Sequence, residues 1–183
     1  MKLKWLKKVS AEEEVSNEEI KQILFHEGSL TRLLQESCSG LFNVQVLSEA
    51  WQQAMTEELT LLSLKEDEIS FIRKSLLKNN EQILVYARTV IPEKTLTGEN
   101  EALASLGDKP LGDFLFSHES TYRSEIRYAK IPVDCELHIE ANRDVHTDNE
   151  LWGRQSLIYI EQKPLLITEV FLPAILECKI KSN

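Results

Sequence analysis

Several sequence features that mark large functional classes are missing from this chain of 183 residues. It has no glycine-rich phosphate loop, no HExxH motif and no GxSxG motif, and only six glycines in all. Nucleotide cofactors and the common hydrolase machineries therefore have no support. No apolar run approaches the roughly 18 residues of a membrane span. The lysines of the initial MKLKWLKK are followed by Ala11 and three glutamates, where a signal peptide has its apolar core. We expect a cytoplasmic protein without membrane insertion.

Cysteine is scarce. Cys38, Cys135 and Cys178 are an odd number, lie far apart and form no CxxC pair. The sequence favours three reduced structural thiols in a reducing cytosol over metal ligands or disulfides.

Basic residues are outnumbered. The 21 Lys and Arg face 30 Asp and Glu, which gives a formal net charge of -9. This balance argues against non-specific binding to nucleic acid or to anionic membranes, because both attract basic surfaces. A small anionic ligand remains compatible, since local arginines decide its binding. The length and the 42% hydrophobic share predict one domain over 1–183, with loosely ordered ends at 1–15 and 176–183.

Turn residues and hydrophobic spacing divide the chain into short elements. Helices are predicted after the capping box at 16–19, from Ser29 through Leu34, over 99–106, and briefly after Pro110. Residues 55–67 are expected to be a connection. Strands are predicted at 42–46, 69–77, 83–91, 122–131, 151–160 and 164–172, with 133–141 as a candidate for another.

These strands follow one another through short turns with few helices between them. That order indicates an antiparallel sheet with helices packed on one side, an α+β fold, and argues against a doubly wound parallel sheet.

An acid interrupts the apolar pattern of the last strand. Glu169 shares one face with Leu165, Ile167 and Phe171 by the two-residue period of a strand. A buried carboxylate needs a partner or a raised pKa, and such acids concentrate at functional sites. A structural acid satisfied by a neighbouring arginine is the alternative, and the pattern leaves both open.

Arginines show the same pattern. Arg73, Arg88 and Arg154 each lie in phase with apolar strand neighbours. Because guanidinium groups bind carboxylates through paired hydrogen bonds, several inward arginines near a buried acid suggest a pocket for a small polycarboxylate. An internal salt-bridge network, or arginines facing water from edge strands, would give the same pattern. The helix starts at 29–31 and 109–112 could add backbone N–H donors for an anion.

Taken together, a series of short segments resembles the chorismate pyruvate-lyase family over about 24–174. The segments are RTVIP at 88–92, TLTG at 95–98, LG at 106–107, KPLG at 109–112, FLF at 114–116, LWGR at 151–154, Ser156, KPLL at 163–166 and TEVFLPA at 168–174.

The resemblance implies an activity. Enzymes of this family remove the enolpyruvyl group of chorismate as pyruvate and leave 4-hydroxybenzoate, the first committed step toward ubiquinone. It also implies a cytoplasmic protein, expected to be a monomer, that needs no cofactor or metal and has an antiparallel sheet with helices over an enclosed ligand cavity.

The family's functional residues can be carried onto this sequence. The ligand-binding arginine falls on Arg73 and the acid on Glu169, both as catalytic and substrate-binding residues. The two substrate-binding backbone amides fall on Leu30 and Leu111. Arg88 and Arg154 stand in family motifs and are second-tier candidates for substrate binding.

Two points depart from the family or compete with it. The connection at 132–149 is longer than expected, and we anticipate an additional strand or a flap that affects the cavity. The runner-up function is a non-catalytic effector-sensing domain of the same fold that binds small aromatic acids. That function needs a DNA-binding partner domain, and only about 25 residues precede the similar region, too few for one. A lyase that forms another aromatic acid is a third possibility.

Overall fold

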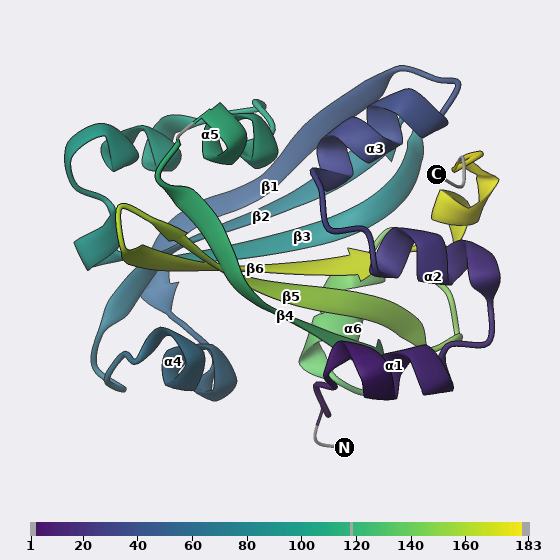
Figure 1. Ribbon diagram of the computed structural model, residues 1–183, viewed down its shortest axis with the longest axis horizontal. Coiled ribbons are helices and arrows are strands. Elements are labelled where there is room, and N and C mark those ends of the chain that lie inside the picture. The colour runs from purple at the N-terminus through teal and green to yellow at the C-terminus, as the bar shows by residue number, and fades with distance from the viewer. Residues whose placement is uncertain (1–2, 118, 181–183) are drawn as a thin grey trace.

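The computed structural model describes residues 3–117 and 119–180. Six antiparallel strands form one sheet in the order β1-β2-β3-β6-β5-β4. The strands are β1 (Phe42–Gln53), β2 (Ile69–Asn79), β3 (Gln82–Pro92), β4 (Thr121–Ile131), β5 (Leu151–Ile160) and β6 (Lys163–Phe171). The predicted α+β class and its antiparallel sheet are confirmed (Figure 1). None of the helices in the described residues is long and apolar enough to cross a membrane.

Tight turns make the hairpins. Asn80, with a φ of 53°, joins β2 to β3, and Glu161 and Gln162, with φ of 49° and 66°, join β5 to β6. Asparagine tolerates this left-handed conformation better than most residues, which is why the sequence signalled the first hairpin clearly. Both predicted strand pairs are confirmed, and β1 runs seven residues past the predicted end at 46.

Helices cover both faces of the sheet, whereas one covered face was expected. The α3 helix (Leu30–Ser37), η2 (Gly98–Ser105) and α5 (Leu111–Ser117) pack on one face. The α4 helix (Thr56–Leu62) and α6 (Glu136–Ala141) pack on the other. The physical reason is that the central strands are apolar on both sides, so each face needs a cover.

Two connections are helical where another conformation was expected. Residues 133–141 form no strand: Leu137, His138 and Ala141 are buried at helical spacing in α6. The 55–67 connection contains α4, which buries Leu59 and Leu62. The sequence of 133–141 alternates like a strand, and that of 55–67 is acidic like a loop. Both also contain apolar residues three to four positions apart, which is the spacing of a helix.

The described residues near both ends pack against the domain, whereas 1–15 and 176–183 were expected to be loosely ordered. The α1 helix (Lys8–Glu14) buries Ala11, and Leu6 forms a β-bridge with Tyr128. At the other end, η3 (Pro173–Glu177) leads to Cys178, which is 8% exposed. Residues 1–2 and 181–183 lie outside the described residues.

A disulfide joins Cys38 to Cys178 across a sequence separation of 140. The prediction of three reduced thiols is therefore wrong for this pair, while Cys135 is free. Cys38 caps the end of α3, and the Lys179 N–H donates to the Ser37 carbonyl at 3.1 Å, so the two backbones lie side by side. Contact between residues so distant in sequence has no local signature.

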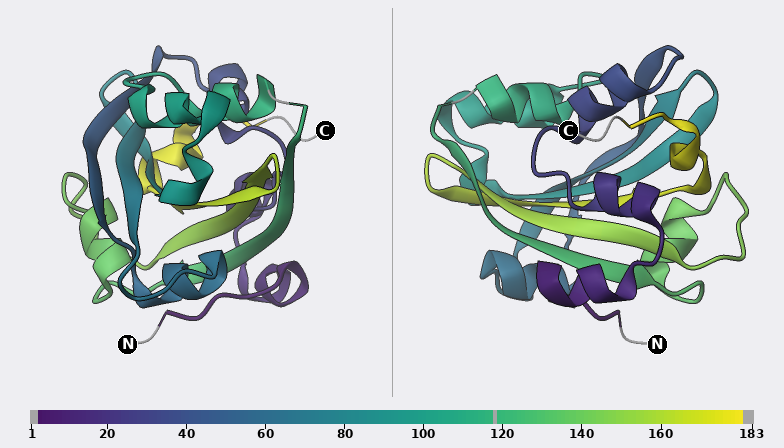
Figure 2. Two further views of the ribbon diagram at one scale, coloured as in Figure 1. Left: turned by 90° about the vertical axis from the view of Figure 1, so that its left-hand side faces the viewer. Right: turned by 45° about the vertical axis from the view of Figure 1, so that its right-hand side comes forward.

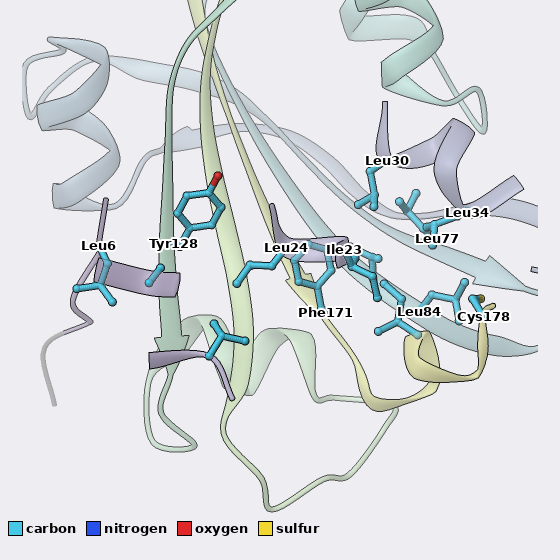
Figure 3. Close-up of a cluster of buried hydrophobic side chains, with 14 residues drawn as sticks. Leu6, Ile23, Leu24, Leu30, Leu34, Leu77, Leu84, Tyr128, Phe171 and Cys178 are labelled. Carbon is cyan, nitrogen blue, oxygen red and sulfur yellow. The ribbon is translucent and has the colours of Figure 1, made fainter. Parts of the chain in front are cut away.

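The core fixes α3 over the sheet. Ser29 caps the helix by accepting the Arg32 N–H, as predicted. Leu30 and Leu34 of the helix belong to one apolar cluster with Leu77 of β2, and Figure 3 shows them side by side. The same cluster holds residues of α2 (Glu18–Leu24) and the C-terminal Cys178. These contacts fix the position of the start of α3 over the sheet.

The sheet is strongly curled. In the left view of Figure 2 its β1 and β4 sides rise opposite each other, and α5 lies across the open side between them. The 3-10 helix η1 (Glu93–Thr95) and η2 lead from β3 to this covering helix. The concave face of the sheet, closed by the starts of helices, can therefore enclose a ligand.

Candidate active site

A cavity of about 230 Å³ lies between the curled sheet and the starts of α3 and α5. Apolar side chains form much of its wall. They are Val44, Leu77, Leu115, Ile158 and Ile167. Polar groups enter at separate points, among them Ser29 and Thr31 from the start of α3 and Thr89 from β3. Such a mixture of apolar wall and few polar groups is typical of small-ligand sites.

Arg73 enters the cavity from β2 and is only 2% exposed. Its Nη1 donates to the Glu49 carboxylate on the neighbouring strand β1, where the two residues are register partners. Its Nη2 donates to the Lys109 carbonyl at 3.3 Å. These contacts hold the guanidinium between the sheet and the loop before α5.

Glu169 enters the same cavity from β6. Arg154, its register partner on β5, donates from Nε to Glu169 Oε2 at 2.5 Å. The Arg154 Nη1 donates to the His26 carbonyl, which joins this ion pair to the segment before α3. The sequence left open whether Glu169 is an acid of a functional site or a structural acid with an arginine partner. The structure shows features of both, because Glu169 lines the cavity and is paired with Arg154.

The sheet register sets the spacing of the two predicted residues. The order β2-β3-β6 places Arg73 and Glu169 two strands apart, about 10 Å between backbones at ordinary strand spacing. Both face the same side, because Thr89 pairs with both Arg73 and Ile167, while Ala87 pairs with Glu169. The inward-pointing side chains can therefore contact opposite ends of one small molecule.

Leu30 and Leu111 also line the cavity, each as the first residue of its helix. The two helix starts approach closely: a Cβ placed on Gly112 would lie 3.2 Å from Ser29 Oγ. Residues at the first helical turn carry N–H groups without a helical partner, and these favour anions. The four residues predicted as the primary site, Leu30, Arg73, Leu111 and Glu169, thus meet at one cavity.

The second-tier residues are placed differently. Arg154 serves as the partner of Glu169 and is 1% exposed. Arg88 points to the opposite face of the sheet, where its Nε and Nη2 donate to both carboxylate oxygens of Glu58 at 2.8 and 3.0 Å. The expectation that Arg88 binds substrate is therefore wrong for this cavity, because its strand parity is opposite to that of Thr89.

The long 132–149 connection is also on the far face. Its helix α6 contributes Glu136 and Glu140 to a groove shared with Lys74 and Arg88. In the part of the chain that the structure describes, this segment contributes no residue to the cavity of Arg73 and Glu169. The expected flap over the ligand cavity is accordingly not formed by these residues.

Three charged residues in or beside the cavity, Glu27, Glu49 and Arg123, were not identified by sequence analysis. Glu49 lies in a strand extension that was not predicted, and its link to Arg73 depends on β1–β2 register. Arg123 of β4 lines the cavity because the register shifts between Arg123 and Glu125. That β-bulge places Arg123 opposite Ile158, whereas Arg127 lies on the other face, opposite Gln155. Strand parity alone gives no sign of the bulge.

The site holds charges of both signs: Arg73 and Arg123 line the cavity together with Glu27 and Glu169. Burial lowers the pKa of His26, and the nearby Arg154 and Arg123 lower it further, so its imidazole is neutral near pH 7. Burial and Arg154 also lower the pKa of Arg123, which remains a cation at any physiological pH. The described residues contain no group of three His, Cys, Asp or Glu arranged to hold a metal ion. What the cavity offers is a set of fixed cations and amides for a small acid.

Comparisons with known proteins agree with this geometry. The family model described as chorismate lyase matches residues 2–181. A probable chorismate pyruvate-lyase of Methylococcus capsulatus is 36% identical over 153 residues, 84% of this chain and 94% of that protein. A probable chorismate pyruvate-lyase of Psychromonas ingrahamii is 40% identical over 156 residues, 82% of this chain and 81% of that protein.

Solved structures share the fold at low identity. The C-terminal domain of a histidine utilization repressor from Pseudomonas syringae aligns with a TM-score of 0.57 at 7% identity, over 78% of this chain and 98% of that one. At that identity the likeness concerns the fold alone.

Proposed function

The chain belongs to the chorismate lyase family, and from this membership we propose that it is a chorismate pyruvate-lyase. It converts chorismate to 4-hydroxybenzoate and pyruvate. The observation that carries the proposal is the meeting of Arg73 and Glu169 in one largely apolar cavity. A cavity of about 230 Å³ suits a single-ring acid of this size.

Arg73 and the Leu30 and Leu111 amides bind the ring carboxylate in this proposal. The support is that all three line the cavity and that Glu49 and the Lys109 carbonyl fix the guanidinium in place. A substrate held at one end by fixed donors loses its orientational freedom before the bond breaks. The apolar wall then excludes water from the ring.

The reaction needs one bond to break and one proton to leave the ring. The ether bond between the ring carbon and the enolpyruvyl oxygen breaks, and the electron pair stays on that oxygen. The adjacent ring carbon, which bears the hydroxyl, loses its hydrogen as a proton, and the ring becomes aromatic. The released enolpyruvate takes up a proton and tautomerises to pyruvate, so the balance requires no oxidant or reductant.

Glu169 faces the 4-oxygen of the product in this arrangement, as a hydrogen-bonding group or a proton carrier. The Arg154 guanidinium holds its carboxylate at 2.5 Å and so fixes its direction. Positive charge from the arginines around Glu169 stabilises the negative charge that grows on the departing enolpyruvyl oxygen.

The alternative, a non-catalytic sensor of small aromatic acids, is less favoured. The repressor domain shares the fold at 7% identity, whereas the lyase relatives share 36% and 40% over most of both chains. The finer parts of the proposal are a cytoplasmic location, a monomeric state, 4-hydroxybenzoate destined for ubiquinone and turnover without an added cofactor.

Incubation of the purified protein with chorismate, without added metal, tests the proposal. Pyruvate is followed by a coupled dehydrogenase and 4-hydroxybenzoate by chromatography. Equal appearance of the two products is expected. Tight binding of 4-hydroxybenzoate without any turnover would favour the sensor, and neither binding nor turnover would reject both functions.

A further inference from the structure

Two arginines, Arg73 and Arg123, line the cavity, and a third, Arg154, holds the lining residue Glu169; Arg73 and Arg154 are ion-paired. Arg73 pairs with Glu49, and Arg154 pairs with Glu169. Within the described ranges, no carboxylate forms a salt bridge with Arg123. Its Nη1 donates to the Glu27 carbonyl at 2.6 Å, and the Glu169 and Glu27 carboxylates attract the cation electrostatically without a direct hydrogen bond to it.

Three side-chain donors in or beside the cavity have no hydrogen-bond partner in the part of the chain that the structure describes. The Nε of Arg123, the Oγ1 of Thr121 and the Nη2 of Arg154 are buried and have no hydrogen-bond partner among the described residues. Thr121 and Arg123 both line the cavity. Arg123 as a whole is half-buried, but its Nε is buried, and a buried donor without an acceptor is costly unless a ligand supplies one.

The Arg123 guanidinium lies at the end of the cavity that holds Glu169, because Arg123 donates to the Glu27 carbonyl while Arg154, the partner of Glu169, donates to the adjacent His26 carbonyl. We propose that Arg123 binds the carboxylate of the enolpyruvyl group of chorismate. The inference rests on the proposed function and adds a residue to its site. Chorismate has two carboxylates, one on the ring and one on the enolpyruvyl group, and the Arg73 end takes only the first.

The chemistry of the substrate supports the placement. The enolpyruvyl ether sits on the ring carbon next to the one that carries the hydroxyl, so its carboxylate lies beside the group that faces Glu169. Arg123 is close enough to Glu169 and Arg154 to interact with both electrostatically. The bulge in β4 turns the Arg123 side chain toward the cavity, and the side chain then reaches the Glu27 carbonyl.

One consequence separates substrate from product. Of the substrate and its ring product, only chorismate carries the carboxylate that Arg123 binds, because 4-hydroxybenzoate has lost it. Arg123 is therefore a specificity-determining residue that distinguishes a dicarboxylate from the monocarboxylate product.

The test compares Arg123→Gln, Arg123→Lys and the control Arg127→Gln. Arg127 lies on the same strand, and its side chain contacts Gln155 and Trp5 on the other face. Three ligands are used: chorismate, 4-hydroxybenzoate and 3-(1-carboxyvinyloxy)benzoate, an aromatic dicarboxylate that cannot gain aromaticity by elimination.

For Arg123→Gln we expect the KM for chorismate and the Kd for the aromatic dicarboxylate to rise about 10- to 100-fold, as for loss of a charged hydrogen bond. The Kd for 4-hydroxybenzoate should stay unchanged. Arg123→Lys should recover part of the loss, and Arg127→Gln should match the parent. Equal loss for all three ligands, or no loss for the dicarboxylates, would overturn the inference.

Two results separate this inference from the proposed function. A parent protein without chorismate turnover rejects the function itself, whereas an active parent with unaffected Arg123 variants rejects only the role of Arg123. If Arg123→Gln does not fold, the parent protein is tested instead. It is expected to bind 3-(1-carboxyvinyloxy)benzoate more tightly than 3-hydroxybenzoate, and equal binding of the two would contradict a carboxylate-binding role of Arg123.

Discussion

Individual side chains of this site act in cation–carboxylate pairs. Arg73 is fixed by Glu49 and Glu169 by Arg154, and in each pair one member lines the cavity while its partner comes from the neighbouring strand. Because each pair is formed across a strand register, a change at one member disturbs the direction of the other. The pairing also satisfies charges that burial would otherwise penalise.

At this scale, Arg73→Ala is expected to lower kcat/KM for chorismate about 100-fold or more, because the fixed donor for the ring carboxylate is lost. The fold should persist, as judged by circular dichroism. Arg32→Ala is the control, since Arg32 is exposed and pairs with Glu36 within α3. A fully active Arg73→Ala protein would contradict the assignment of Arg73 as the residue that binds the ring carboxylate.

Sequence reasoning was strongest for residues whose neighbours are close in the chain. Arg73 and Glu169 stood out because each breaks an apolar strand pattern, and both line the cavity. Glu49 and Arg123 did not, because the first depends on pairing between two strands and the second on a bulge. Arg88 followed the same pattern as Arg73 yet faces the other side of the sheet.

At the scale of elements, the β5–β6 pair carries the acid, and a glycine lets the two strands fit. A Cβ on Gly153 would lie 2.9 Å from the Glu169 carbonyl and 2.6 Å from Ile131 Cδ1. Both distances are too short for a real contact, so a side chain at 153 must displace β6 or the end of β4. The position of Glu169 therefore depends on this glycine.

Gly153→Ala should lower the free energy of unfolding by about 1–3 kcal/mol, as overpacking does in well-packed interiors. It should also reduce turnover, because the shift moves Glu169. Urea unfolding and steady-state kinetics measure the two effects. Gly98→Ala serves as a comparison for glycine substitution at an open site, since nothing lies within 4 Å of its added Cβ, although its positive φ adds backbone strain. An unchanged Gly153→Ala protein would contradict the packing described.

The α6 helix is attached to the far face of the sheet by a charged network. Glu140 accepts from Lys74 and, at 2.5 Å, from the Tyr86 hydroxyl. Burial alone would raise the pKa of Glu140, but the bonds from Lys74 and Tyr86 outweigh it and lower the pKa below 4.5. The stabilisation is present at pH values above the unfolded pKa and disappears as pH falls through the folded one.

Glu140→Gln is thus expected to cost about 2 kcal/mol of unfolding free energy at pH 7, the value of a charged hydrogen bond. The difference from the parent should shrink as pH falls below the ordinary carboxyl range near 4.5. Denaturant unfolding at a series of pH values measures it. A difference that grows toward acid would have the wrong sign for this network.

At the scale of the whole molecule, the curled sheet and the starts of α3 and α5 make the cavity. The alternation of strands and turns predicted most strands and two of the strand pairs, but not the order of strands in the sheet, its curl or the packing of α1 and η3. Those features depend on contacts between distant segments. The disulfide between Cys38 and Cys178 is the clearest case, since 140 residues separate its two ends.

This disulfide ties α3, whose start lines the cavity, to the C-terminal segment. Reduction, or Cys38→Ser, should lower the free energy of unfolding by about 2–5 kcal/mol, because a long loop in the unfolded chain is released. Thermal unfolding with and without a reductant measures it. Cys135→Ser is the control, since Cys135 is free. A melting temperature insensitive to reductant in the parent would contradict the linkage.

The most direct measurement is the structure of the protein with 4-hydroxybenzoate bound. The account predicts the ligand in the cavity under α3 and α5, with its carboxylate at Arg73 and the Leu30 and Leu111 amides and its hydroxyl at Glu169. A ligand bound in the far-face groove beside Arg88, or reversed in the cavity with its carboxylate toward Glu169, would contradict the account.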